Sequence, residues 1–136
     1  MISFNYETDF ELPKESQLSN WISATISNEK CKEGEINYIF CDDNYLLKLN
    51  EEFLNHDTLT DIISFDYSVG KELHGDIYIS VERVADNAKD FNNKFIDELH
   101  RVMIHGILHY CGYKDKTEVD EALMRQKEND YLAKLS

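Results

Sequence analysis

The sequence is poor in the residues that mark linkers, disulfide frameworks and membrane spans. It has one proline and five glycines among 136 residues, which leaves no room for a flexible linker between domains. Its three cysteines, Cys31, Cys41 and Cys111, form no CxxC pair, so free thiols in a reducing compartment are expected. The segment MISFNYETDF lacks the basic start and apolar run of a signal peptide, and the longest apolar runs are far short of a membrane span. We therefore expect one domain over 1–136, cytoplasmic and without a membrane partner.

Basic residues are also scarce relative to acidic ones. The chain has 14 lysines and arginines against 27 aspartates and glutamates, which gives a formal net charge of −13. A generic nucleic-acid-binding protein carries a basic patch, so a polyanionic ligand would need a local cluster of bases, a metal ion or a partner protein. Hydrophobic residues still make up 42% of the chain and aromatic residues 12%, which is enough to build a core and argues against disorder.

The pattern of apolar residues predicts alternating strands and helices. Short β-rich segments predict strands at 2–6, 35–41, 61–67 and 74–80. Apolar residues at helical spacing predict helices at 13–30, 42–53, 80–88, 93–112 and 117–135. Gly70 lies between the last two strands, which favours a hairpin-like turn there. This order is typical of an α+β fold in which a small mixed sheet of about four strands packs against helices.

The segment HGILHYCGYKD places His105 and His109 four residues apart within the most apolar part of the chain. Residues i and i+4 lie on one face of a helix, so both imidazoles can point at a single metal ion. Gly112 can end this helix in a left-handed conformation, and the chain can then bring Asp115 back as a third ligand. The pattern HxxxHxxGxxD thus predicts one zinc ion, with a fourth position for a water that acts as the nucleophile near neutral pH.

Two further positions bear on the chemistry of this site. Zinc proteases with an HExxH motif use the glutamate after the first histidine as general base, and Gly106 occupies that position here. Another group, or the substrate itself, would therefore have to handle the proton. Glu98 lies seven residues before His105 on the same helical face, where it is either a partner that orients the histidine or a solvated carboxylate.

Several long motifs, in the same order along nearly the whole chain, are similar to those of one family. HGILHYCGYKD matches the signature HGxLHLxGYDH, LNEEFLNHDTLTDIISF looks like LNxxYRxxDxxTDVLSF, and LHGDIYIS looks like LGDIxIS. ALMRQKENDYL is similar to the closing helix. The chain in these respects resembles the YbeY-type endoribonucleases, which are bacterial rRNA maturation factors. The resemblance implies a metal-hydrolase fold, one zinc, and cleavage of single-stranded RNA in ribosomal RNA maturation and ribosome quality control. The implied partners are ribosomal RNA and ribosomal or ribosome-associated proteins.

The chain departs from the family pattern at two positions. Asp115 stands where the family has a third histidine, which keeps a ligand but adds a negative charge to the metal. Leu54 stands where the family has an arginine that could hold phosphate and stabilise transition-state charge. Arg83, Lys94 and Arg101 are the residues that we predict could contact RNA in its place.

Three other functions compete with a zinc-dependent endoribonuclease that acts through His105, His109 and Asp115. A non-catalytic ribosome-assembly factor with a structural metal is favoured by the negative charge and by Leu54. A metal-dependent peptidase is disfavoured by Gly106. A ferrous oxygenase also uses two histidines and a carboxylate, although two histidines on one helix followed by a glycine turn are more typical of a zinc hydrolase.

Overall fold

The computed structural model describes residues 1–54 and 60–135 and contains all the predicted strands and helices. In chain order these elements are β1 (Ile2–Tyr6), α1 (Glu15–Asn28), β2 (Lys32–Cys41), α2 (Asp43–Leu54), β3 (Ile62–Asp66), β4 (Glu72–Ser80), α3 (Val81–Asp90), α4 (Phe95–Tyr110) and α5 (Glu118–Leu135). The predicted α+β class is therefore confirmed. The largest difference at a strand end is in β2, which begins at Lys32 because its polar first residues pair with β4.

The four strands form one mixed sheet in the order β1-β2-β4-β3. The pairs β1–β2 and β2–β4 are parallel, whereas β3 and β4 form the expected antiparallel hairpin. Gly70 in the turn of this hairpin has a φ of 60°, a left-handed conformation that glycine adopts at little cost. The hairpin brings the start of β3 next to the end of β4, where α3 begins, since Ile62 pairs with Ile79.

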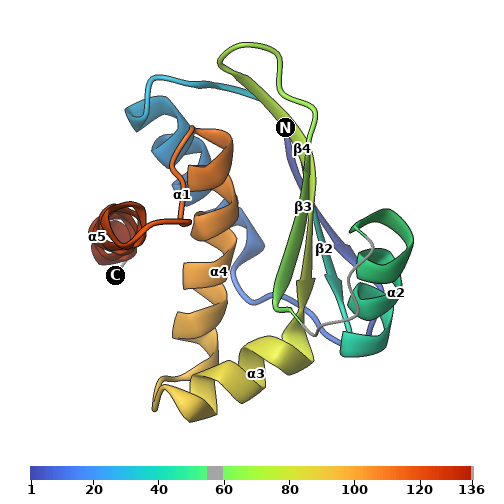
Figure 1. Cartoon of the computed structure of the whole chain (residues 1–136). Helices are drawn as coiled ribbons and strands as arrows, with labels where there is room; N and C mark the ends of the chain where they lie inside the picture. The colour runs from blue at the N-terminus through green and yellow to red at the C-terminus, as the bar shows by residue number, and fades with distance from the viewer. Residues whose placement is uncertain (55–59, 136) are drawn as a thin grey trace.

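Helices cover both faces of the sheet. Figure 1 shows α1 and α4 on one face, with α5 packed outside them, α2 on the opposite face, and α3 across one end of the sheet. The larger core lies between the sheet and the α1–α4 layer and includes Ile36, Tyr38, Phe40, Leu99, Met103 and Ile107. A smaller core under α2 contains Cys41, Leu46 and Ile63. Burial of both faces explains why β2 and β4 are rich in apolar residues.

The helix α4 is the central helix of the main core. Its buried side includes Leu99, Met103 and Ile107, and the Tyr38 hydroxyl donates a hydrogen bond of 2.8 Å to the Met103 carbonyl. Gly106 allows close approach to the sheet, because a Cβ there would lie 3.2 Å from side-chain methyls of β3 and β4. This docking holds the helix that carries both histidines rigidly against the sheet.

Predicted capping residues open three of the helices. Side-chain oxygens of Asp42, Ser80 and Thr117 accept hydrogen bonds from backbone N–H groups three residues further on, at 2.8, 3.1 and 3.1 Å, respectively. By contrast, α4 begins at Phe95, two residues later than the sequence predicts, and Lys94 at its N-cap makes no side-chain cap. Packing against the sheet rather than a cap therefore determines where α4 starts.

The last helix is tied to the rest of the domain through α1. The Trp21 indole N–H donates a hydrogen bond of 2.8 Å to the Tyr131 carbonyl, and both side chains are buried. Met124, Glu128 and Tyr131 form the buried side of α5. Within residues 1–54 and 60–135, no helix is long and apolar enough to cross a membrane.

The contact between α4 and β4 gives a first testable prediction, at Gly75. A Cβ at this position would overlap the Tyr110 hydroxyl and the Phe65 carbonyl, which are joined by a hydrogen bond of 2.9 Å. Backbone cannot move aside cheaply, so Gly75→Ala should lower the free energy of unfolding by about 1–3 kcal/mol, as overpacking does. Urea denaturation measures this. Gly106→Ala is the matched control, because it meets only flexible methyl groups and gains helix propensity; an equal loss in both variants would contradict the prediction.

Candidate metal centre

Three polar side chains converge beside the C-terminal half of α4. The Nε2 atoms of His105 and His109 are 3.0 Å apart. Asp115 Oδ2 lies 3.3 Å from the Nε2 atom of His105 and 3.2 Å from that of His109. These three side chains form the metal-compatible group among the described residues, so the predicted convergence is present in the structure.

The spacing of these atoms fits one small divalent ion. Zinc bonds nitrogen and oxygen ligands at about 2.0–2.1 Å, so the ligand atoms of a tetrahedral site lie about 3.3 Å from one another. The observed separations of 3.0, 3.2 and 3.3 Å are close to that distance. Three protein ligands that leave a position open are typical of catalytic zinc sites. The donor set therefore fits zinc, and the binding of zinc stays a prediction.

A buried carboxylate orients the first histidine. Glu128, whose side chain is 6% exposed, lies with Oε2 2.7 Å from the Nδ1 atom of His105. Because an ionised carboxylate only accepts hydrogen bonds, the proton of the neutral imidazole must sit on Nδ1. The lone pair on Nε2 then points toward His109 and Asp115, as a metal ligand requires. Arg101 donates a hydrogen bond of 2.8 Å to the other oxygen of Glu128 and completes the chain of contacts.

These contacts change the pKa values of both partners. Burial would raise the pKa of Glu128, but hydrogen bonds from His105 and Arg101 lower it below its usual value. Burial would likewise lower the pKa of His105, but its hydrogen bond to Glu128 and the negative charges of Glu128 and Asp115 raise it. Glu128 is thus held as an anion, which is the form that keeps the proton on Nδ1 of His105.

The turn after α4 positions the third side chain. Gly112 has a φ of 107°, so it ends the helix in a conformation that favours glycine, as the sequence predicts. The Tyr113 hydroxyl donates a hydrogen bond of 2.8 Å to Glu29 at the end of α1, and the Lys127 ammonium lies 5.5 Å from the centre of the Tyr113 ring. The turn is therefore fixed to α1 and α5, and Asp115 is held toward the histidines.

The carboxylate partner of His105 comes from a different helix than the sequence suggests. Glu98 is buried and not solvated, but it accepts a hydrogen bond of 3.4 Å from the Asn93 amide. Glu128 has the role instead, and the sequence contains one signal for it. It lies four residues after Met124 and three before Tyr131, on the buried side of α5, where an unpaired carboxylate would be costly.

Two cavities flank the metal centre. The larger, about 440 Å³, lies toward the start of α5 and is lined by His105, Asp115, Glu118, Glu121, Ala122, Met124, Arg125 and Glu128. The smaller, about 280 Å³, lies toward α3 and the start of β3 and is lined by Asp61, Ile62, Asn87, Phe91, Glu98, Arg101, Val102, His105, Arg125 and Glu128. We call them the acidic cavity and the α3 cleft. His105, Arg125 and Glu128 line both, so the two cavities adjoin at these residues.

Asp61 is a partly buried carboxyl group that lines the α3 cleft, together with the buried Glu98 and Glu128. It lies at the start of β3, where its Oδ2 accepts a weak hydrogen bond of 3.4 Å from the Asn87 amide. Burial raises the pKa of Asp61, and hydrogen bonds from backbone N–H groups, the proximity of His105 and the Asn87 amide only partly offset this. Asp61 and His105 line the same cleft. Because its pKa is raised, Asp61 carries its negative charge less readily than an exposed aspartate.

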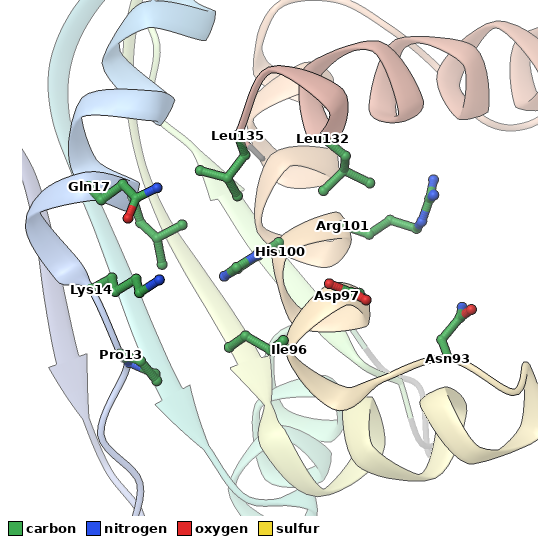
Figure 2. Close-up of a pocket in the computed structure, with 11 residues that line it drawn as sticks. Pro13, Lys14, Gln17, Asn93, Ile96, Asp97, His100, Arg101, Leu132 and Leu135 are labelled. Atoms are coloured by element: carbon green, nitrogen blue, oxygen red, sulfur yellow. The ribbon is translucent and has the colours of Figure 1, made fainter.

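A cavity larger than these two lies away from these residues. It has a volume of about 530 Å³ between α1, α4 and α5. Figure 2 shows His100 pointing into this space toward Gln17 and Lys14, while Arg101 points away from it. None of the three convergent side chains lines it, so size alone does not identify the reactive site.

The three residues predicted to contact RNA lie in different surroundings. Arg83 is paired with Asp43 at 2.9 Å and with Asp86 at 3.5 Å on the surface of α3. Lys94 is the N-cap of α4. Arg101 is engaged by Glu128, and it is the one of the three that lines the α3 cleft. RNA contact by these residues stays a prediction, as does the effect of Leu54, which is exposed at the end of α2.

Comparison with known proteins identifies close relatives over almost the whole chain. Residues 3–136 match the family model described as endoribonuclease YbeY. Relatives described as endoribonuclease YbeY, from Flavobacterium psychrophilum and Flavobacterium johnsoniae, are 67% and 65% identical to this chain. The alignments cover 97% and 98% of this chain and 94% and 96% of the relatives. The solution structure of a protein from Thermotoga maritima matches with a TM-score of 0.71 at 27% identity, over 99% of this chain and 89% of that one.

Proposed function

Since the chain belongs to the YbeY endoribonuclease family, we propose that it is a zinc-dependent hydrolase that cleaves phosphodiester bonds in single-stranded RNA. The single observation that carries the metal dependence is the convergence of His105, His109 and Asp115. The proposed substrate is ribosomal RNA during maturation and quality control. The proposed partners are ribosomal or ribosome-associated proteins, and the proposed location is the cytoplasm.

Each residue of the centre has a separate part in this proposal. Zinc held there would polarise a phosphoryl oxygen and lower the pKa of an attacking water. His105 and His109 supply neutral nitrogen lone pairs, and Asp115 supplies an oxygen and a negative charge. Glu128 keeps the proton of His105 on Nδ1, through the 2.7 Å contact, and so leaves Nε2 free to bind metal.

Two of the competing functions differ in their support. A non-catalytic assembly factor is favoured by the net charge of −13 and by the absence of the family arginine at Leu54. A peptidase of the HExxH type is disfavoured, because Gly106 is buried against Ile62 and Ile77 and supplies no general base.

Metal removal separates an enzyme from an assembly factor with a structural metal. We expect dialysis against a chelator to abolish cleavage of a labelled single-stranded RNA and added zinc to restore it. The fold should persist in circular dichroism, because the main core packs through residues of β2 and α4 that do not contact the ligand atoms. Cooperative unfolding on metal removal would instead favour the structural site, and cleavage that continues without metal would contradict the proposal.

A further inference from the structure

The α3 cleft contains features that the metal centre alone does not explain. It adjoins His105, has a volume of about 280 Å³ and is bordered by the start of β3 and by α3, α4 and α5. Its walls combine an aromatic ring, an arginine and a polar floor. These are the three kinds of group with which proteins hold a single-stranded nucleotide: a stacking surface, a cation for phosphate, and hydrogen-bonding groups for the base.

Phe91 is the aromatic ring of the cleft. It follows the last turn of α3, and its residue surface is 61% exposed. Among the aromatic contacts of the described residues, none involves Phe91, in contrast to the exposed Phe53, which packs edge-on against Phe65 at 5.8 Å. A large apolar side chain that lines a cleft without packing on another ring is available for a flat ligand.

Arg125 is the available cation of the cleft. Its side chain is 60% exposed, and its ion pair in the described structure is a long contact of 3.9 Å with Glu128. Arg101 is less available, because it already donates at 2.8 Å to Glu128 and at 2.7 Å to Asn129. Arg125, like His105, lines both the α3 cleft and the acidic cavity, so it lies where the two cavities adjoin.

The floor of the cleft offers hydrogen bonds to a base. Asn87 lies one turn before Phe91 on α3, and both line the cleft. Its amide uses one N–H in the weak bond to Asp61, which leaves a second N–H and a carbonyl oxygen for a ligand. A donor and an acceptor on one side chain suit the edge of a nucleobase.

The charges favour this cleft over its neighbour as the place where RNA is held. Besides Glu128, the acidic cavity is lined by Asp115, Glu118 and Glu121, which repel phosphate. The α3 cleft is also lined by three carboxylates, Asp61, Glu98 and Glu128, but Glu128 is paired with Arg101 at 2.8 Å and Arg125 adds a second positive charge, so its charges are more nearly balanced.

We propose that the α3 cleft is a nucleotide subsite for single-stranded RNA, in which Phe91 stacks on a base and Arg125 contacts a phosphate beside the metal centre. This rests on the proposed function, since the subsite places the neighbouring phosphodiester at His105. A duplex keeps its bases stacked on one another, so the subsite selects single strands.

Binding measurements on metal-free protein test the subsite without cleavage. The probes are a fluorescein-labelled single-stranded RNA, followed by anisotropy, and the same RNA with one 2-aminopurine, whose fluorescence is quenched by stacking. Phe91→Ala should weaken binding about 5- to 150-fold and remove the quenching, whereas Phe91→Trp should retain both. Arg125→Gln should weaken binding and reduce the slope of log K against log salt by about 0.7, the value for one phosphate contact on a single strand.

Matched controls separate contact from a general change in charge or surface. Tyr67→Ala removes an aromatic residue that is 60% exposed, and Lys71→Gln removes one positive charge; neither residue lines the two cavities. Both control variants should leave the affinity and the salt slope as in the parent. All four substituted positions are on the surface, and circular dichroism checks that each variant is folded.

The outcomes distinguish the subsite from the proposed function. Losses confined to Phe91→Ala and Arg125→Gln support the subsite. If the parent binds and cleaves RNA but these two variants bind as the parent does, the subsite is wrong and the proposed function stands. If the zinc-loaded parent cleaves no RNA and the metal-free parent binds none, the proposed function is overturned and the subsite with it.

Discussion

Replacement of Asp115 by alanine is expected to abolish RNA cleavage and to weaken zinc binding by more than about 100-fold. Mutation of a residue that only hydrogen-bonds to a metal ligand already lowers metal affinity about 10–100-fold. Asp115 would itself supply one of three protein bonds to the metal, together with a negative charge. Its Oδ2 atom lies 3.3 and 3.2 Å from the two imidazole Nε2 atoms, so no other described carboxylate completes the group. Competition with a chromogenic chelator measures the affinity, and RNA cleavage is measured in parallel.

The fold of this variant should persist, which separates loss of a ligand from loss of structure. Asp115 is partly exposed at the metal centre, and α4 docks through Leu99, Val102 and Met103. Glu118→Ala is the matched control, because Glu118 lines the same acidic cavity but lies outside the ligand group. Unchanged zinc affinity and activity in Asp115→Ala would remove it from the site, and a loss in Glu118→Ala instead would assign the third ligand to that residue.

Asp115→His adds a comparison in the opposite direction. It supplies the three-imidazole set of the family signature and removes one negative charge from the ligands. A less negative ligand set makes a bound water more acidic, so the pH optimum of cleavage should be lower than that of the parent. Zinc affinity, measured by the same competition, should be retained. A pH optimum that stays in place while metal is bound would show that the charge of Asp115 does not control the attacking water.

Replacement of Glu128 by glutamine is expected to have the second largest effect, about 10- to 100-fold in zinc affinity. Glutamine has nearly the same shape but no charge, and its amide can donate to Nδ1 of His105. The proton of the imidazole can then sit on Nε2, where it blocks the metal. The tautomer is directly measurable from the ¹⁵N chemical shifts of His105 in the metal-free protein, a signal that a general loss of stability would not change.

Glu128→Gln should also lower the free energy of unfolding. The Glu128 side chain is 6% exposed, and its carboxylate pairs with Arg101. Loss of the charge leaves the Arg101 guanidinium with a weaker partner, which should lower the free energy of unfolding by about 1–3 kcal/mol. Asp130→Asn removes the same charge from the exposed side of α5 and should change neither quantity. If the two variants bind zinc equally well, Glu128 does not orient His105.

The convergence of the three side chains could be predicted from the sequence because they are close together in the chain. His105, His109, Gly112 and Asp115 lie within eleven residues, and one helical turn followed by a glycine turn is enough to bring them together. The strands and helices were predictable for a similar reason, since the period of the apolar residues reports which face of each element is buried. The hairpin of β3 and β4 followed from two adjacent strands joined by a short turn.

The second carboxylate could not be chosen in the same way. Glu98 has the right helical spacing from His105, but spacing does not say what lies opposite that face of α4. Glu128 is 23 residues away along the chain and reaches His105 only because Trp21 and the turn at Tyr113 hold α5 against α1 and α4. Its burial next to Met124 and Tyr131 was a signal for an inward position, not for a partner.

The sequence by itself determined the elements, the α+β class and the convergence of His105, His109 and Asp115, because each depends on spacing within one helix, strand or turn. Only the tertiary structure decided which carboxylate pairs with His105 and which arginine remains available beside the metal centre. It also brought the end of α3 next to His105, so that Phe91, Arg125 and Asp61 line one cleft. These are contacts between elements distant in the chain. Their partners are selected by helix packing and by the exclusion of water, which no local pattern encodes.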